Sequence, residues 1–183
     1  MLLDATKSFL LLIDMQERLL PAMSGGAEVE RRCSILLTAA QRLDLPAIAS
    51  EQYPKGLGHT VPGLRNQLGN AAVFEKTAFS CWRDDALKAA LIARHEGGRP
   101  QAIVAGIETH VCVLQTTLDL AAAGFAVFAV ADAMTSRATA STELAERRMH
   151  QAGVAVVNTE MVVFELLGRA GTAEFKTLSA LIR

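Results

Sequence analysis

The chain has 183 residues, 51% of them hydrophobic and 5% aromatic, and its formal net charge at pH 7 is −1. This length predicts a single domain over residues 1–183 that buries about 70% of its extended-chain surface. A charge near zero gives no electrostatic reason to expect a nucleic acid or an anionic membrane as partner. Three cysteines, an odd number without paired spacing, predict free thiols in a reducing, cytoplasmic compartment.

The first expected element is the apolar run Phe9–Ile13. It predicts a buried strand, since five residues are too few for a signal sequence or a membrane span. Asp14 follows this strand directly, and Met15–Pro21 carries none of the glycines that a dinucleotide pyrophosphate requires. A helix is expected next, over Glu28–Leu43. Its predicted buried face consists of Val29, Ile35, Leu36 and Leu43.

Two further strands are expected at Pro46–Ser50 and Ala72–Phe74. The loop between them, Glu51–Pro62, is rich in Gly and Pro and long for an α/β protein, and such loops often line sites. Lys76 follows the second of these strands. The other expected strands are Ala102–Ala105, Ala126–Val130 and Val154–Val157, and the other expected helices are Asp84–His95, Thr142–Ala152, Thr159–Leu167 and Ala173–Ile182.

One more helix is expected after the strand Ala102–Ala105, and its first turn carries Cys112. Its apolar residues Val111, Leu114, Leu118 and Ala121 recur at three- and four-residue spacing. Thr109 stands at the expected N-cap and Gly124 at the expected stop. The free N–H groups and dipole of a first turn favour an anion, so we expect the pKa of Cys112 below the usual value of about 8.5. Cys112 is therefore a candidate nucleophile, with a small buried hydrophobe as the alternative.

The alternation of strands and helices predicts an α/β fold of three layers. Its centre is a doubly wound, six-stranded parallel sheet with helices on both faces. With strand order 3-2-1-4-5-6, Asp14 and Cys112 would meet where the order reverses, and Lys76 would lie on the same rim. An acid, a cation and a thiol placed there can activate a nucleophile. Taken singly, Asp14 could be a helix cap and Lys76 a solvated side chain.

Three motifs resemble those of the isochorismatase-like cysteine hydrolases: Leu12–Gln16 (LIDMQ), Glu75–Ser80 (EKTAFS) and Gly106–Val113 (GIETHVCV). The likeness covers nearly the whole chain, including Ala131–Arg137 and Glu51–Gly58, and the latter loop resembles the small isochorismatase-domain proteins. The resemblance implies a catalytic triad of Asp14, Lys76 and Cys112. It also implies a non-proline cis peptide between Ile107 and Glu108, which turns the N–H groups of Glu108 and Cys112 toward an oxyanion.

Two departures from related enzymes narrow the expected chemistry. Where nicotinamidase-type members carry an Asp-x-His-x-x-His metal cluster, this chain has Ser50–Tyr53 and no histidine before His59. A stable metal site usually needs three or more protein ligands, so we expect no metal and no cofactor. Isochorismate-cleaving enzymes lack the nucleophilic cysteine, and the presence of Cys112 argues against their vinyl-ether hydrolysis.

The sequence therefore predicts a metal-independent cysteine hydrolase that cleaves a C–N bond of a small amide or carbamoyl substrate through a thioester on Cys112. Apolar C-terminal helices predict a homo-oligomer. Candidate pocket walls are Gln16, Gln52, Tyr53, Phe79 and Trp82. Two alternatives stay open: a catalytically idle family member that binds a ligand or serves in assembly, and a thiol-redox protein. The redox alternative lacks an evident resolving partner, because Cys81 is near in sequence only to Lys76.

Overall fold

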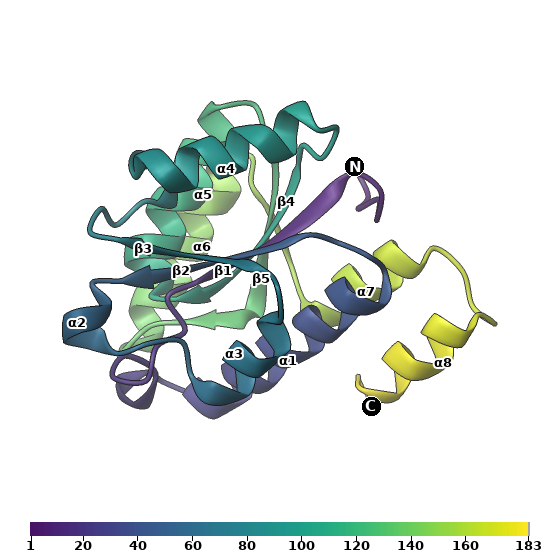
Figure 1. Ribbon diagram of the computed structural model, residues 1–183, viewed down its shortest axis with the longest axis horizontal. Coiled ribbons are helices and arrows are strands. Elements are labelled where there is room, and N and C mark those ends of the chain that lie inside the picture. Colours follow the sequence, from purple (N-terminus) through teal and green to yellow (C-terminus); the bar gives the residue numbers. More distant parts are fainter. Residues whose placement is uncertain (183) are drawn as a thin grey trace.

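The computed structural model describes residues 1–182, in which a parallel sheet lies between two layers of helices (Figure 1). The sheet has six strands in the order β3-β2-β1-β4-β5-β6, which confirms the predicted fold class and order. The strands are β1 (Ser8–Ile13), β2 (Ala47–Gln52), β3 (Ala72–Lys76), β4 (Gln101–Ile107), β5 (Ala126–Thr135) and β6 (Ala155–Val157).

The two helical layers are built from helices of 4 to 17 residues. They are α1 (Gly26–Arg42), α2 (Pro54–Leu57), α3 (Pro62–Leu68), α4 (Asp85–Glu96), α5 (Leu114–Ala122), α6 (Thr139–Gln151), α7 (Thr159–Leu167) and α8 (Ala173–Ala180). Three single turns, η1 (Leu20–Ala22), η2 (Cys81–Arg83) and η3 (Thr109–Val113), complete the described elements. None of the helices described within residues 1–182 has the length and apolar character that a membrane span requires.

The alternation of side chains along β1 explains why helices cover both faces of the sheet. Leu10 and Leu12 belong to the apolar cluster under α1, α3 and α7. Phe9, Leu11 and Ile13 belong to the cluster under α4, α5 and α6, on the opposite face (Figure 1). Every residue of β1 is buried, so its carboxyl end, where Asp14 begins, is held from both sides.

Several element boundaries differ from those expected. The helix α3 was missed, because Pro62 was assigned to a loop, whereas it starts this helix as its first residue. The strand β2 continues through Glu51 and Gln52, so the expected loop is shorter and contains the helical turn α2. The helix α6 starts at Thr139, three residues before the predicted start.

Gly106 allows β4 to approach β1 beside the start of Asp14. Its φ is +123°, and a Cβ at this position would lie 2.0 Å from the carbonyl oxygen of Ile13. Only glycine avoids this clash, which involves backbone atoms that cannot rotate away. The position of Asp14 therefore depends on the missing side chain of Gly106.

Replacement of Gly106 by Ala should lower the free energy of unfolding by about 3 kcal/mol or more, because both the backbone angle and the contact with Ile13 are unfavourable. Gly124→Ala is the matched control: its φ is +90°, but no atom lies within 4 Å of the added Cβ. We expect it to cost about 1–2 kcal/mol. Urea unfolding measures both values, and equal losses would contradict the assigned close approach.

Candidate active site

Asp14 and Lys76 form a buried ion pair at the carboxyl ends of the strands. Lys76 Nζ donates to Asp14 Oδ2 at 2.8 Å, and both side chains have no exposed surface. The other carboxylate oxygen, Oδ1, accepts a hydrogen bond from Ser50 Oγ at 2.7 Å. The backbone N–H of Asp14 also donates to the Ser50 carbonyl, at 3.0 Å. Asp14 is thus held through its backbone and through both carboxylate oxygens.

The ammonium group of Lys76 has acceptors for all three of its protons. Besides Asp14, it donates to Gln52 Oε1 at 2.6 Å and to the Phe79 carbonyl at 3.2 Å. Burial is the largest single effect on Lys76 and lowers its pKa. The negative charge of Asp14, together with contributions from Cys81, Cys112 and the hydrogen bond to Asp14, outweighs burial and holds the pKa above its usual value. Lys76 is therefore a fixed positive charge inside the protein.

Cys112 lies in the turn η3, which leads directly into α5. This turn is a π-helical turn whose N-cap is Glu108, so the expected N-cap role of Thr109 is wrong. The N–H groups of Val111 and Val113 both donate to the Glu108 carbonyl, at 3.1 and 3.2 Å. The peptide bond between Ile107 and Glu108 is cis. The first turn is thus wider than an α-helical turn, and no threonine side chain caps it.

The environment of Cys112 raises the pKa of its thiol, contrary to the lowered value expected from its helix position. Burial is the main cause, and the negative charge of Asp14 adds to it, while Lys76 acts in the opposite direction. Burial and a neighbouring negative charge both disfavour a thiolate. Cys112 is therefore a protonated thiol at neutral pH, and it needs a base such as Asp14 to become a nucleophile.

The other two cysteines are less accessible than Cys112. Cys33 and Cys81 have 0% exposed surface, whereas Cys112 retains 7%. Burial raises the pKa of Cys33, and it raises the pKa of Cys81 to about 11. Access, more than acidity, therefore distinguishes Cys112 from the other thiols.

Ser50 is a site residue that the sequence interpretation did not single out. Ser50 on β2 is paired in register with Ile13 on β1, and Ile13 is the residue before Asp14. The sequence carried a usable signal for Ser50, because it is a polar residue at the end of a predicted strand and parallel strand ends share one edge of the sheet. Cys81 is a second site residue that was not singled out, and its Sγ lies 3.6 Å from Ser50 Oγ.

Three of the five candidate pocket residues lie beside Lys76. The side-chain amide of Gln52 accepts a hydrogen bond from Lys76 and donates one to the Thr77 carbonyl. The Phe79 carbonyl also accepts a hydrogen bond from Lys76. The side chains of Tyr53 and Phe79 are 55% and 53% exposed. Tyr53 lines a cavity of about 340 Å³ together with Lys55, Glu75, Lys76 and Asp84, among others. Lys76 is thus part of the lining of this cavity, although its side chain has no exposed surface.

The other two candidates have structural contacts. Gln16 is fully buried, and its side-chain amide forms hydrogen bonds with the backbone of Gln52 and Gly58, at the two ends of the loop after β2. Trp82 packs edge-on against Phe125 in the apolar cluster under α4 and α5. Gln16 therefore fixes the loop that borders the site, and Trp82 supports the core.

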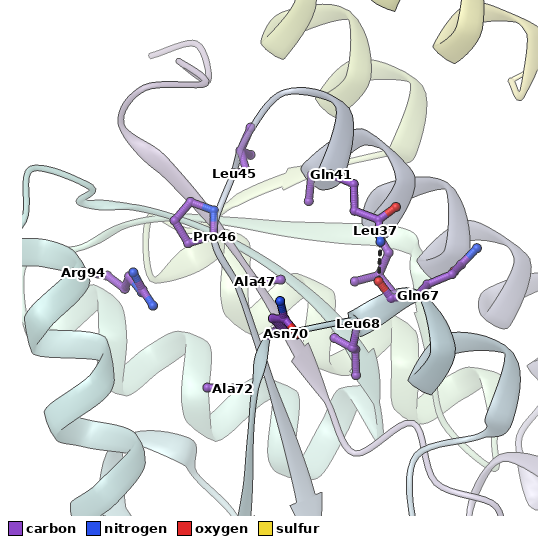
Figure 2. A pocket seen from close by; sticks show the side chains of 12 residues that line it. Leu37, Gln41, Leu45, Pro46, Ala47, Gln67, Leu68, Asn70, Ala72 and Arg94 are labelled. Atoms are coloured by element: carbon purple, nitrogen blue, oxygen red, sulfur yellow. Dashed lines mark hydrogen bonds between the residues drawn. The ribbon is translucent and has the colours of Figure 1, made fainter.

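A separate cavity lies at the opposite end of the sheet, where β2 and β3 begin (Figure 2). It measures about 340 Å³, and Arg94 and Asn70 are among its lining residues. On one side of it, Gln41 donates a hydrogen bond from Nε2 to the Gln67 carbonyl. The ion pair is at the carboxyl ends of the strands, so this cavity is not part of the candidate active site.

Glu51 and His59 are the two possible ligands in the segment for which the sequence predicts no metal site. Glu51 accepts hydrogen bonds from His59 Nδ1 at 2.8 Å and from the N–H and Oγ1 of Thr60. Burial raises the pKa of Glu51, but these hydrogen bonds outweigh it and hold the pKa below its usual value. Throughout residues 1–182, His, Cys, Asp and Glu form no group of three or more that could hold a metal ion. Glu51 instead fastens the loop to β2.

The isochorismatase domain family matches residues 8–161 of the chain. The chain belongs to the isochorismatase family. Isochorismatase domain-containing protein 1 of Salmo salar is 39% identical over 170 residues, covering 93% of this chain and 59% of the fish protein. The chain thus spans about 59% of the length of this relative.

Several solved structures are similar over nearly the whole chain. The MAR1 ribonuclease from Caenorhabditis elegans is 37% identical with a TM-score of 0.92, covering 100% of this chain and 92% of that one. YcaC from Pseudomonas aeruginosa, described with hexane-2,5-diol and covalent acrylamide, is 27% identical with a TM-score of 0.92 and coverage of 98% and 91%. YcaC from Escherichia coli, described as an octameric hydrolase of unknown specificity, is 28% identical with a TM-score of 0.91 and coverage of 98% and 90%.

Limiting iodoacetamide at neutral pH should modify Cys112 before Cys33 and Cys81, because Cys112 is the most accessible thiol.

Asp14→Asn should speed the modification of Cys112 about tenfold or more, because it removes a negative charge that raises the pKa of Cys112. Adding Lys76→Met to that variant should slow the reaction again, since the positive charge that lowers the pKa is lost. Mass-spectrometric peptide mapping gives the order and the rates. Earlier modification of Cys33 or Cys81 would contradict the assignment of the nucleophile.

Proposed function

We propose that the chain is a metal-independent cysteine hydrolase that cleaves a C–N bond in a small amide or carbamoyl-type substrate. The buried Asp14–Lys76 pair, whose charges act on the Cys112 thiol, is the observation that carries this proposal. The catalytic residues in this proposal are Asp14, Lys76 and Cys112. Membership of a family with hydrolase members supports the reaction class.

In the proposed reaction, Asp14 takes the proton of Cys112 as the sulfur attacks the carbonyl carbon. Lys76 keeps Asp14 ionised before this step and stabilises the ion pair formed during it. The N–H groups of Glu108 and Cys112 are the proposed donors to the tetrahedral oxyanion, and such a donor typically contributes about 10²–10³ in rate. Asp14 then passes the proton to the leaving nitrogen, the C–N bond breaks and a thioester remains.

Water completes the cycle by attacking the thioester carbon. Asp14 accepts a proton from this water, the C–S bond breaks, and the proton returns to the departing sulfur of Cys112. The products are the free acid and an amine or ammonia. No step requires a metal or a cofactor.

The relatives favour an enzyme over the two alternatives. YcaC from Pseudomonas aeruginosa is described with covalent acrylamide, which supports a reactive nucleophile in that relative. A thiol-redox sensor needs a thiolate-rich, accessible cysteine, whereas burial and Asp14 raise the pKa of Cys112. An idle binding module would not need Asp14 to be held through both carboxylate oxygens.

A panel of small amides and ureides, with ammonia release as the signal, tests this function. We expect activity on at least one compound, and Cys112→Ser should reduce it by about 10³-fold or more because the nucleophile is lost. Activity should survive exhaustive treatment with EDTA, since the ligand set beside Glu51 and His59 is incomplete.

Two results would contradict the proposal. One is turnover that Cys112→Ser leaves unchanged, and the other is activity that EDTA abolishes and zinc, iron or manganese restores. Cleavage of RNA by the wild-type chain, without turnover of any amide, would instead assign it the activity named for the Caenorhabditis elegans relative. A net charge of −1 offers little attraction for a polyanion, so we expect no such cleavage.

We further propose that the chain forms a cytoplasmic homo-oligomer. Its three cysteines are free, as in a reducing compartment, and the Escherichia coli relative is octameric. Met161, Phe164 and Leu181 of the C-terminal helical region are exposed by 45%, 42% and 37%, although they are apolar. Light scattering at micromolar concentration should give a mass that is a multiple of 19.5 kDa. A stable particle of 19.5 kDa would contradict this proposal.

A further inference from the structure

A buried chain of hydrogen bonds leads to the carboxylate oxygen of Asp14 that Lys76 does not contact. Ser50 Oγ donates a hydrogen bond to Asp14 Oδ1 at 2.7 Å, and it accepts one from Cys81 Sγ at 3.6 Å. The backbone N–H of Cys81 donates to Thr116 Oγ1 at 2.9 Å. Ser50, Cys81 and Thr116 are exposed by 1%, 0% and 0%. Water therefore does not compete for these contacts.

The chain of hydrogen bonds has a single direction. A hydroxyl group carries one proton, and Ser50 gives it to Asp14, so the Ser50 oxygen is left as an acceptor for the Cys81 thiol. Burial raises the pKa of Cys81 to about 11, and the thiol therefore remains a protonated donor at neutral pH. Cys81 thus acts here as a hydrogen-bond donor and not as a nucleophile.

We infer that Ser50 and Cys81 are positioning residues for Asp14: Cys81 holds the Ser50 hydroxyl in its rotamer, and Ser50 keeps the carboxylate ionised and oriented. This inference rests on the proposed function, in which Asp14 is the base. Thr116 extends the same contacts into α5, whose preceding turn carries Cys112. The base and the nucleophile are therefore linked through the protein interior as well as across the site.

The titratable groups around Asp14 come from three elements. They are Lys76 at the end of β3, Cys81 in η2 and Cys112 in η3. Replacing Ser50 changes none of these charges, and it removes only a donor to the ionised carboxylate. Loss of such a donor favours the protonated form of a carboxylate. A change in the pH dependence of the site would thus report the hydrogen bond itself.

The experiment measures the rate at which 2,2′-dithiodipyridine modifies Cys112, as a function of pH and relative to a free thiol. Relative to the free thiol, the rate should rise on the acid side, where Asp14 takes up a proton and its negative charge no longer opposes ionisation of Cys112. Ser50→Ala should move this rise about one unit to higher pH, as expected for one hydrogen bond to a charged group. Cys81→Ala should move it less, because S–H is a weak donor. Ser50→Thr and Cys81→Ser retain a donor and should leave the rise in place.

Two variants are matched controls. Ser8 is also fully buried and donates to a side-chain oxygen, that of Gln101, at 2.9 Å. Cys33 is also fully buried, and its Sγ lies 3.6 Å from the Ala133 carbonyl. Ser8→Ala and Cys33→Ala should leave the acid-side rise unchanged, because neither residue belongs to the chain of contacts that ends at Asp14.

The possible outcomes separate this inference from the proposed function. Equal changes in rate at every pH for Ser50→Ala and Cys81→Ala would indicate altered access alone and would overturn the inference. A wild-type profile without an acid-side rise, or one that Asp14→Asn does not change, would instead contradict the interaction of Asp14 with Cys112 on which the proposed function rests. If Ser50→Ala does not fold, the comparison of Cys81→Ala with Cys81→Ser decides the matter.

Discussion

The buried ion pair between Lys76 and Asp14 is the contact on which the whole site depends. Neither side chain has exposed surface, so each charge relies on the other and on hydrogen bonds. Removing one partner from such a pair generally costs about 3–5 kcal/mol. The pair joins the end of β3 to the end of β1, and β2 between them supplies Ser50 and Gln52 as the remaining partners. The order of the strands is thus a requirement of the site as well as of the core.

The same burial determines the state of the nucleophile. An exposed cysteine at a helix start would lose its proton readily, but burial and the charge of Asp14 raise the pKa of Cys112. The protein therefore holds the thiol in its unreactive form and places a base beside it. In the proposed reaction, proton transfer accompanies attack on the substrate, and the raised pKa of Cys112 would protect the thiol from oxidation between turnovers.

The fold could be predicted from the sequence because the expected strands are short, mostly apolar runs that alternate with helices, and the helices α1 and α5 have a clear apolar period. The site could be predicted only in part. Asp14 directly follows a predicted strand and Lys76 lies two residues after another, but the pKa of Cys112 depends on burial and on its surroundings, which periodicity does not reveal. Ser50 could have been found from its place at the end of a strand beside β1. Cys81 could not, because no pattern predicts the path of the segment after β3.

The central claim is that burial and the charge of Asp14 together keep Cys112 protonated until a substrate arrives. Its most direct test is a titration of thiolate absorbance in the far ultraviolet, taken as the difference between the wild-type chain and Cys112→Ser. We expect Cys112 to ionise well above the usual thiol pKa of about 8.5, and at a lower pH in Asp14→Asn. A thiolate already present at neutral pH in the wild-type chain, unchanged by Asp14→Asn, would contradict this account.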